Sequence, residues 1–424
     1  MPLPLRHAAR RPSTVVGAAV TALVTSLVLL PAAPAQAASD ASLMTRWSSS
    51  AELSKGARVA TTVASNEVRL GSTTNRWGYD DPHTSGGATT YEWGSWTSPW
   101  ASTGFKAKAL VPSWNATTPR GTWIRVDARV RSGSTVGSWD SVGAWAFSAS
   151  DVKRTSYPAQ SDDLAKMNVD TLMATKAGGF DGYQLRVMLF RKPGTTGSPT
   201  LQSAGAIAST FTSRSVTTSR TTMTKTVELK VPKYSQMIHR GHYPQFGNGG
   251  EAWCSPTSTS MVLRFFGDRP GTPDTGGIAG ADPWVDHAAT YTYDYAYGGT
   301  GNWPFNTAYA GRFGFDAFVT RLANLRDAEA FVKAGIPVVA SLAWSRGGLS
   351  GAPISSTPGH LMVIVGFTST GKVIVNDPAA PSNTSVRRVY DRAQFEKAWL
   401  GGSGAISYVI RPTSKKLPPD TARW

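Results

Sequence analysis

Cys254 is the only cysteine of the 424-residue chain, and its surroundings suggest thiol chemistry. A single cysteine cannot form an internal disulfide, so packing alone must stabilise the fold. Pro256 and the hydroxyl side chains around it are typical of a helix N-terminus, and Gly267 is typical of a helix end. Backbone N–H groups at a helix N-terminus stabilise a thiolate and lower the pKa of the thiol. The sequence therefore predicts a nucleophile at Cys254, and the alternative is a buried, inert cysteine.

A thiol nucleophile needs an imidazole and a polar group that orients it, and one hairpin can supply both. Two β-branched runs flank residues 368–371, which predicts two antiparallel strands joined by a turn. With a two-residue turn at 368–369 or 369–370, the numbers of opposed residues sum to 737 or 739. Either register places His360 and Asp377 on one face, directly opposed or diagonal, whereas an even sum would separate them. Asn376 is the alternative partner for the imidazole, but it has the opposite parity in its strand.

The elements that must position these residues lie in the C-terminal half of the chain. Residues 322–334 have helical spacing, and residues 336–344 are predicted to form a strand. The mixture of helix and strand patterns predicts an α+β domain over residues 227–412. Residues 413–424 are polar and rich in proline, and we expect a flexible tail there.

Four segments of this domain resemble motifs of the papain-like cysteine peptidases related to bacteriocin-leader processing enzymes, called family C thirty-nine. The segments are Val231-Pro-Lys-Tyr-Ser-Gln236, Cys254-Ser-Pro-Thr-Ser258, Gly359-His360 and Val375-Asn-Asp-Pro378. The resemblance covers residues 231–412 and implies a papain-like cysteine peptidase domain. It also implies that Cys254 is the nucleophile, His360 the general base and acid, and Asp377 the orienting carboxylate.

The resemblance further implies that Gln236 is the glutamine whose side-chain amide helps to hold the oxyanion. Gln236 lies 18 residues before Cys254, farther than is usual in the family, so the residues between them would have to loop out. Gln245 is the alternative donor, and the backbone N–H of Cys254 is the other expected donor. Ser255 also departs from the family, because glycine commonly follows the nucleophile.

The N-terminal half has a different pattern, which predicts an all-β sandwich over residues 38–210. Residues 121–131 and 183–191 alternate with period two, and turn residues recur about every ten positions. Residues 113–123 resemble β-sandwich accessory regions found beside secreted bacterial hydrolases. Residues 211–226 consist mostly of Ser, Thr and Arg, and this composition predicts a linker between the two domains.

The β-sandwich region is rich in tryptophan, and the chain is basic, with a formal net charge of +16. We expect most of these rings to fill the core, and the alternative is that exposed rings bind a cell-wall glycan. The charge favours attraction to anionic cell-wall polymers. The basic residues are scattered and form no nucleic-acid motif, so we expect no nucleic-acid partner. The tryptophans in question are Trp93, Trp96, Trp100, Trp114 and Trp123.

Residues 1–37 have the pattern of a secretory signal peptide. Three arginines precede an apolar run over residues 15–30, and Pro34-Ala-Gln-Ala37 resembles a cleavage site. The apolar run is shorter than the roughly 20 residues that a membrane span needs. We therefore expect cleavage after Ala37, secretion of the mature chain, and no membrane span after cleavage.

The predicted function is that of a secreted cysteine peptidase that cleaves peptide or protein substrates through a Cys-His-Asp triad and a thioester acyl-enzyme. Acyl transfer is a related chemistry that the sequence does not separate from hydrolysis. The alternative from another class is a non-catalytic cell-wall or glycan-binding protein with an inactive papain-like domain. We expect no cofactor and no metal, because none of the metal-type side chains has the paired spacing of helical metal motifs. Those side chains are His239, His242, Glu251, Asp286 and His287.

Overall fold

The computed structural model describes residues 40–158, 160–247, 249–267, 275–419 and 424, so the predicted signal peptide lies outside the described residues. Residues 40–424 form one compact unit. No helix in the described part of the chain is long and apolar enough to cross a membrane.

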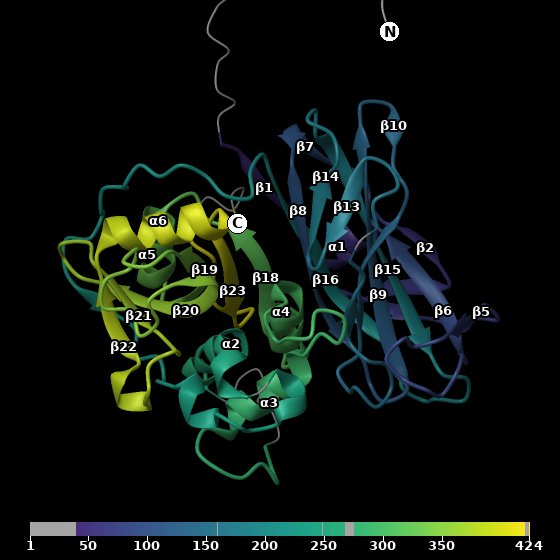
Figure 1. The fold of residues 1–424 in the computed structure, drawn as a ribbon. Helices are drawn as coiled ribbons and strands as arrows, with labels where there is room; N and C mark the ends of the chain where they lie inside the picture. The colour runs from purple at the N-terminus through teal and green to yellow at the C-terminus, as the bar shows by residue number, and fades with distance from the viewer. Residues whose placement is uncertain (1–39, 159, 248, 268–274, 420–423) are drawn as a thin grey trace, which may run out of the picture. The chain divides into compact units, whose positions relative to one another are not determined.

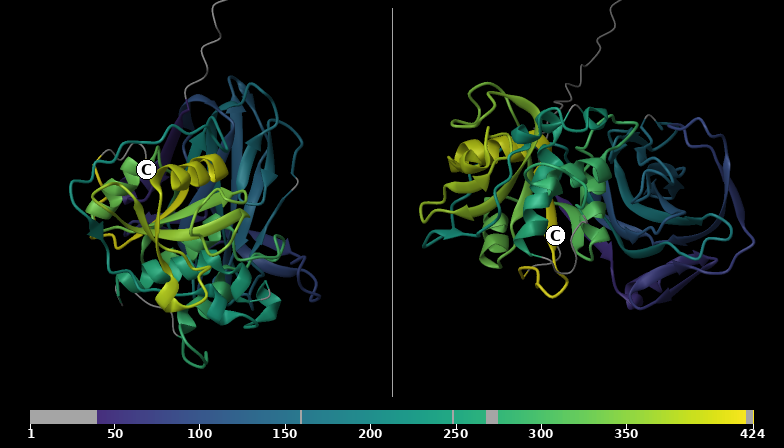
Figure 2. Two further views of the ribbon diagram at one scale, coloured as in Figure 1. Left: turned by 60° about the vertical axis from the view of Figure 1, so that its left-hand side comes forward. Right: turned by 90° about the horizontal axis from the view of Figure 1, so that it is seen from below.

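The N-terminal half is a β-sandwich of two antiparallel sheets, which face each other across a shared core (Figures 1 and 2). The seven-stranded sheet contains β1 (Ser42–Trp47), β3 (Thr61–Ala64), β4 (Glu67–Leu70), β8 (Ala109–Thr117), β13 (Ala165–Asn168), β14 (Thr171–Ala174) and β16 (Thr200–Ser209). The nine-stranded sheet contains β2 (Ala57–Val59), β5 (Arg76–Tyr79), β6 (Thr89–Thr97), β7 (Ala101–Ala107), β9 (Thr122–Ser132), β10 (Thr135–Val136), β11 (Asp140–Trp145), β12 (Thr155–Ser156) and β15 (Phe180–Arg191). A short helix, α1 (Ser50–Leu53), follows β1.

The two segments with period-two alternation are β9 and β15, and they pair with each other in the nine-stranded sheet. This confirms the prediction of an all-β domain at the N-terminal side. Trp96, Trp114 and Trp123 are buried in the core, as expected, whereas Trp93 and Trp100 are half-buried.

The C-terminal half is an α+β domain built on a third antiparallel sheet, in the order β18-β23-β19-β20-β21-β22 with β17 beside β20. Helices α5 and α6 lie on one side of this sheet, and α2 and α3 lie on the other (Figure 1). The strands are β17 (Val227–Glu228), β18 (Asp316–Arg321), β19 (Val338–Trp344), β20 (Thr357–Phe367), β21 (Val373–Asn376), β22 (Arg387–Tyr390) and β23 (Ile406–Arg411). The helices are α2 (Cys254–Phe265), α3 (Pro283–Thr292), α4 (Trp303–Arg312), α5 (Leu325–Lys333) and α6 (Arg392–Ser403), with short 3₁₀ turns η1 (Gln236–His239), η2 (Pro244–Phe246), η3 (Gly250–Ala252) and η4 (Asn383–Ser385).

The segment between the two domains, residues 211–226, forms no helix or strand but is held against α5 and α6. The Glu329 carboxylate accepts hydrogen bonds from the hydroxyls of Thr221 and Thr222. The Glu396 carboxylate accepts one from the backbone of Ser219. At the far end of the chain, Trp424 is buried against the ring of Phe331.

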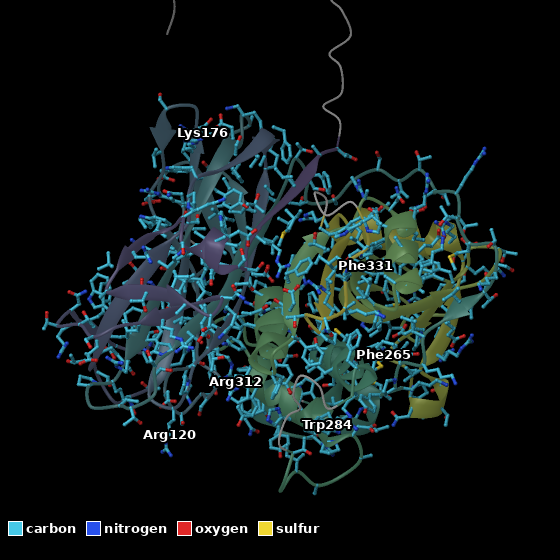
Figure 3. The ribbon with its side chains drawn as sticks, turned by 180° about the vertical axis from the view of Figure 1, so that it is seen from behind. Arg120, Lys176, Phe265, Trp284, Arg312 and Phe331 are labelled. Atoms are coloured by element: carbon cyan, nitrogen blue, oxygen red, sulfur yellow. The ribbon has the colours of Figure 1, made fainter. Side chains whose placement is uncertain are left out.

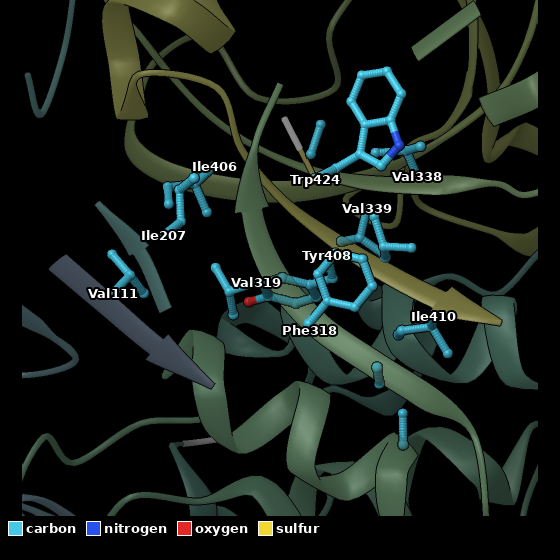
Figure 4. Packing of buried hydrophobic residues seen from close by; sticks show 14 of the residues in the cluster. Val111, Ile207, Phe318, Val319, Val338, Val339, Ile406, Tyr408, Ile410 and Trp424 are labelled. Atoms are coloured by element: carbon cyan, nitrogen blue, oxygen red, sulfur yellow. The ribbon is translucent and has the colours of Figure 1, made fainter. Parts of the chain in front are cut away.

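The sandwich and the α+β domain share one hydrophobic core. Val111 and Ile207 of the sandwich lie beside Val319 and Ile406 of the third sheet (Figure 4). At the edge of this contact, the last residue of α4, Arg312, lies between the two halves (Figure 3), with its guanidinium 4.9 Å from the ring centre of a sandwich phenylalanine. A shared hydrophobic core favours a fixed arrangement of the two domains over free movement of the domains about a flexible linker.

A buried asparagine of the sandwich pairs with the edge of the third sheet. The Asn115 side chain donates to the carbonyl of Ala317 at 2.9 Å and accepts from its N–H at 3.1 Å. Gly311 on α4 makes the close approach possible, because a Cβ there would lie 2.4 Å from the Asn115 amide nitrogen. The sandwich is therefore joined to the α+β domain by specific polar contacts as well as by apolar packing.

Candidate active site

Cys254 is the first residue of α2, as the helix pattern predicts, and the residue as a whole is half-buried. The residues that follow it anchor the helix under the third sheet. Ser255 shares a hydrogen bond with the Tyr408 hydroxyl at 2.9 Å, and Ser258 donates to the carbonyl of Leu361 at 3.2 Å. Ser255 thus has a polar partner of its own, which explains how this position accommodates a side chain. Because Leu361 follows His360 in β20, the Ser258 bond also fixes the thiol close to the imidazole.

His360 stands between Cys254 and Asp377. Its Nε2 lies 2.8 Å from Oδ1 of Asp377, and both side chains are buried. The other ring nitrogen remains available to the Cys254 thiol, and the interaction of the two side chains acts on the pKa of both groups. Burial alone would lower the pKa of His360, but the Asp377 carboxylate and Cys254 together raise it to about 10.

The interaction with His360 lowers the pKa of the Cys254 thiol, whereas it raises the pKa of the imidazole. Burial opposes ionisation of Cys254, but the hydrogen bond and charge of His360 outweigh it, with help from the backbone N–H groups of Leu361 and Ser255. The pKa of Cys254 therefore lies below its ordinary value. A thiol with a depressed pKa beside an imidazole with a raised pKa favours a thiolate–imidazolium pair.

The hairpin brings His360 and Asp377 together by a route that differs from the expected one. Five residues, 368–372, connect β20 to β21, so the two-residue turn is wrong, and next to the turn the opposed pairs sum to the even number 740. A β-bulge at Val365 then shifts the register, and beyond it the pairs Ile364–Val375 and Val363–Asn376 sum to 739. The odd sum is restored before the strands reach the site, so His360 and Asp377 lie on one face, diagonally opposed.

Asp377 is itself held by groups that the sequence analysis missed. The Tyr390 hydroxyl donates to its Oδ2 at 2.7 Å, and the backbone N–H of Ala379 donates to Oδ1 at 3.0 Å. Burial would raise the pKa of Asp377, but the His360 charge and these hydrogen bonds lower it. Tyr390 reaches the site because β22 pairs with β21, a relation that no local signal in the sequence indicates. The neighbouring Asn376 points elsewhere, since its amide donates to the carbonyls of Val231 and Pro232.

Gln236 is buried and lines the same cavity as Cys254 and His360, whereas Gln245 is exposed and does not line it. The residues between Gln236 and the thiol loop out and close through a bridge between Arg240 and Gly249. The Gln236 amide then donates to the carbonyl of Glu251 at 2.8 Å, one turn before Cys254. The long separation in sequence is therefore compatible with a short separation in space.

The cavity has a volume of about 1020 Å³, and the β-sandwich supplies one of its walls. The turn between β13 and β14 contributes Val169 and Asp170 to the lining. Val169 has a φ of 55°, a conformation that glycine usually adopts in such turns and that strains a β-branched residue. Asp170 accepts a hydrogen bond from the backbone of Trp303 at 3.0 Å, which ties the turn to the first residue of α4. Nothing in the sequence pattern indicated that the sandwich reaches the site.

Three of the metal-type side chains also meet in space: His239 and His242 both lie beside Asp286. The other two are engaged separately, because Glu251 forms an ion pair with Arg240 and His287 is hydrogen-bonded to a tyrosine hydroxyl. The spacing argument missed this cluster because its members come from η1, the residues after it, and α3.

Family models match both halves of the chain. Residues 43–209 match the family described as Peptidase C39 N-terminal domain, and residues 228–405 match the Peptidase_C39 like family. No curated protein matches the chain. A solved structure described as a C39-like peptidase from Bacillus anthracis is similar at 18% identity and a TM-score of 0.29, over 44% of this chain and 98% of that chain. Because the two family matches lie on the two halves of the chain and name the same peptidase family, the chain belongs to the C39-type peptidases.

Proposed function

We propose that the protein is an exported cysteine peptidase that hydrolyses peptide bonds through Cys254, His360 and Asp377. The observation that carries this proposal is the buried His360 imidazole, which is hydrogen-bonded to the Asp377 carboxylate and lines the same cavity as the Cys254 thiol. The opposite shifts in the pKa values of Cys254 and His360 support a thiolate–imidazolium pair near neutral pH.

In this mechanism the Cys254 thiolate attacks the carbonyl carbon of the scissile bond, and its electron pair forms the new C–S bond. The tetrahedral intermediate collapses as the imidazolium of His360 transfers its proton to the leaving amine. The remaining thioester is attacked by water, which gives a proton to the now neutral imidazole. When the acid product leaves, the thiolate and the imidazolium are restored. Asp377 holds the ring in position and stabilises its charged form throughout.

Two hydrogen-bond donors would stabilise the oxyanion of the tetrahedral intermediate: the backbone N–H of Cys254 and the side-chain amide of Gln236. The support for Gln236 is its buried position on the wall of the cavity that contains the thiol. The Gln236 amide donates one of its two hydrogens to the backbone carbonyl of Glu251, and this hydrogen bond fixes the orientation of the amide. A donor that is already oriented costs no reorganisation during the reaction.

The two glutamines give a matched pair of variants. Gln236→Ala should lower kcat about 10²- to 10³-fold with a small change in KM, because an oxyanion donor acts mainly on the transition state. Gln245→Ala should leave both constants within about twofold, since that side chain is exposed. Steady-state kinetics on one fluorogenic peptide would compare them, and equal losses in the two variants would remove Gln236 from the oxyanion site.

The peptidase proposal itself is tested by peptide-library profiling of the mature chain beside Cys254→Ala, with cleavage sites read by mass spectrometry. We expect a defined set of cleavages from the wild type and none from the variant. Added hydroxylamine should trap the acyl group and so report the thioester. Identical digests from both proteins, or no cleavage and no acyl transfer by the wild type, would leave the non-catalytic alternative. Export after cleavage is tested separately, since the secreted protein should begin at Ala38.

A further inference from the structure

We propose that His239, His242 and Asp286 form a binding site for one divalent transition-metal ion of the zinc type. Nδ1 of His239 lies 2.8 Å from Oδ2 of Asp286, and Nδ1 of His242 lies 2.8 Å from Oδ1 of the same carboxylate. One donor atom from each residue lies within 4.8 Å of the other two. Three donors from two separate segments thus converge on one point beside the loop that carries Gln236.

The donor set fits zinc better than calcium or magnesium. Two imidazole nitrogens and one carboxylate oxygen are typical zinc ligands, whereas calcium and magnesium prefer oxygen ligands alone. Bonds of about 2.0–2.2 Å in a tetrahedral site place neighbouring donors roughly 3.3 Å apart. The two nitrogen–oxygen pairs, each 2.8 Å apart, already lie slightly closer than that, and the donor set as a whole lies within 4.8 Å, so binding requires the imidazoles to move toward one point. His242 is 36% exposed at its side chain, which allows such a movement and leaves a path for the ion and for a water ligand.

The charge of Asp286 also favours a bound cation. Its carboxylate is completely buried, and in the described part of the chain its ion-pair partners are the two histidines, with no lysine or arginine. The two imidazole Nδ1 atoms each lie 2.8 Å from a different oxygen of this carboxylate. A buried carboxylate is most stable when a cation and hydrogen bonds compensate for its lost hydration. A divalent ion coordinated by all three side chains would supply that cation.

The surroundings suggest what the ion would do. His239 is the last residue of η1, whose first residue is Gln236, and its ring packs near Trp253, the residue before Cys254. Asp286 belongs to α3, so an ion shared by the three side chains would fasten the loop between Gln236 and Cys254 to that helix. The proposed role is structural, because no ligand is a member of the triad.

The test needs a background in which the catalytic thiol cannot bind metal, because a thiolate and an imidazole are themselves zinc ligands. We would use the untagged mature chain with Cys254→Ala, load it with one equivalent of Zn²⁺, and measure the bound metal by mass spectrometry after gel filtration. We expect about one zinc ion per chain and a zinc-dependent rise in melting temperature. Co²⁺ in place of zinc should give visible d–d absorption bands in the parent and lose them in the ligand variants.

Variants in the same background identify the ligands. His242→Ala changes a partly exposed side chain and should fold, and we expect its zinc affinity to fall at least tenfold and its melting temperature to lose the zinc response. Asp286→Asn should do the same if it folds. His83→Ala, in the sandwich, is the matched histidine control and should bind zinc as the parent does. If the Cys254→Ala chain binds no zinc, or if His242→Ala binds it equally well, the cluster is only a hydrogen-bonded clamp and the proposal is wrong.

Discussion

Replacing His360 with alanine should slow the alkylation of Cys254 by iodoacetamide about tenfold or more near pH 6.5. In the wild type the thiolate persists above the lowered pKa of Cys254, and the imidazolium persists below the pKa of His360, about 10. Between these two values the ion pair is intact, so labelling should already be fast at neutral pH. Without the imidazole, a thiol with a pKa near its usual value of about 8.5 is only about 1% ionised at pH 6.5. The greater intrinsic nucleophilicity of a more basic thiolate recovers part of this loss.

The pH dependence of labelling gives the sharper measurement. The midpoint should move to higher pH by more than about one unit in His360→Ala, because the largest favourable influence on the thiolate is gone while burial still opposes it. Peptide cleavage should fall at least 10³-fold, since the same change removes the general acid and base. His83→Ala is the control, with the same type of side chain removed from the sandwich. An unchanged midpoint in His360→Ala would show that the helix N-terminus and the backbone N–H groups hold the thiolate without the imidazole.

The local features of the fold could be predicted because they depend on short-range patterns. The period-two alternation identified β9 and β15, and Pro256 and Gly267 bounded the segment that forms α2. The pairing of His360 with Asp377 is a more instructive case. The prediction assumed a two-residue turn, and this was wrong. The longer turn makes the numbers of opposed residues sum to an even number, and the bulge at Val365 restores the odd sum that places both side chains on one face. A bulge inserts one residue without a clear mark in the sequence, so the register near the turn could not have been derived from the strand patterns alone.

The features that the sequence did not indicate all depend on contacts between segments far apart in the chain. Tyr390 contacts Asp377 through the pairing of β21 with β22, and Asp170 reaches the cavity because the sandwich packs against α4. His242 and Asp286 likewise meet only because the looped-out segment folds onto α3. Motif spacing is informative when ligands lie on one helix or one hairpin, and it carries little information when they come from separate elements.

Asp377→Asn should lower kcat/KM about 10³- to 10⁴-fold, because the imidazole loses the charge that stabilises its protonated form and fixes its tautomer. Tyr390→Phe removes only one hydrogen bond to the carboxylate, at 2.7 Å, and keeps the charge. A hydrogen bond to a charged group contributes about 1.5–3 kcal/mol, so the expected loss is roughly 10- to 100-fold, still smaller than that of Asp377→Asn. The ratio of the two effects separates the charge of Asp377 from the support that holds it in place.

The alkaline limb of the pH–rate profile distinguishes a positioning role from a general loss of structure. Burial lowers the pKa of His360 and Asp377 raises it, so removing the carboxylate charge should move the alkaline limb to lower pH by more than about one unit. Asn376→Ala is the matched control, because Asn376 holds the carbonyls of Val231 and Pro232 on the other face of β21. That variant should leave the alkaline limb in place even if it slows the reaction. If instead the limb moves in Asn376→Ala and stays in Asp377→Asn, the asparagine orients the imidazole and the assignment of Asp377 is wrong.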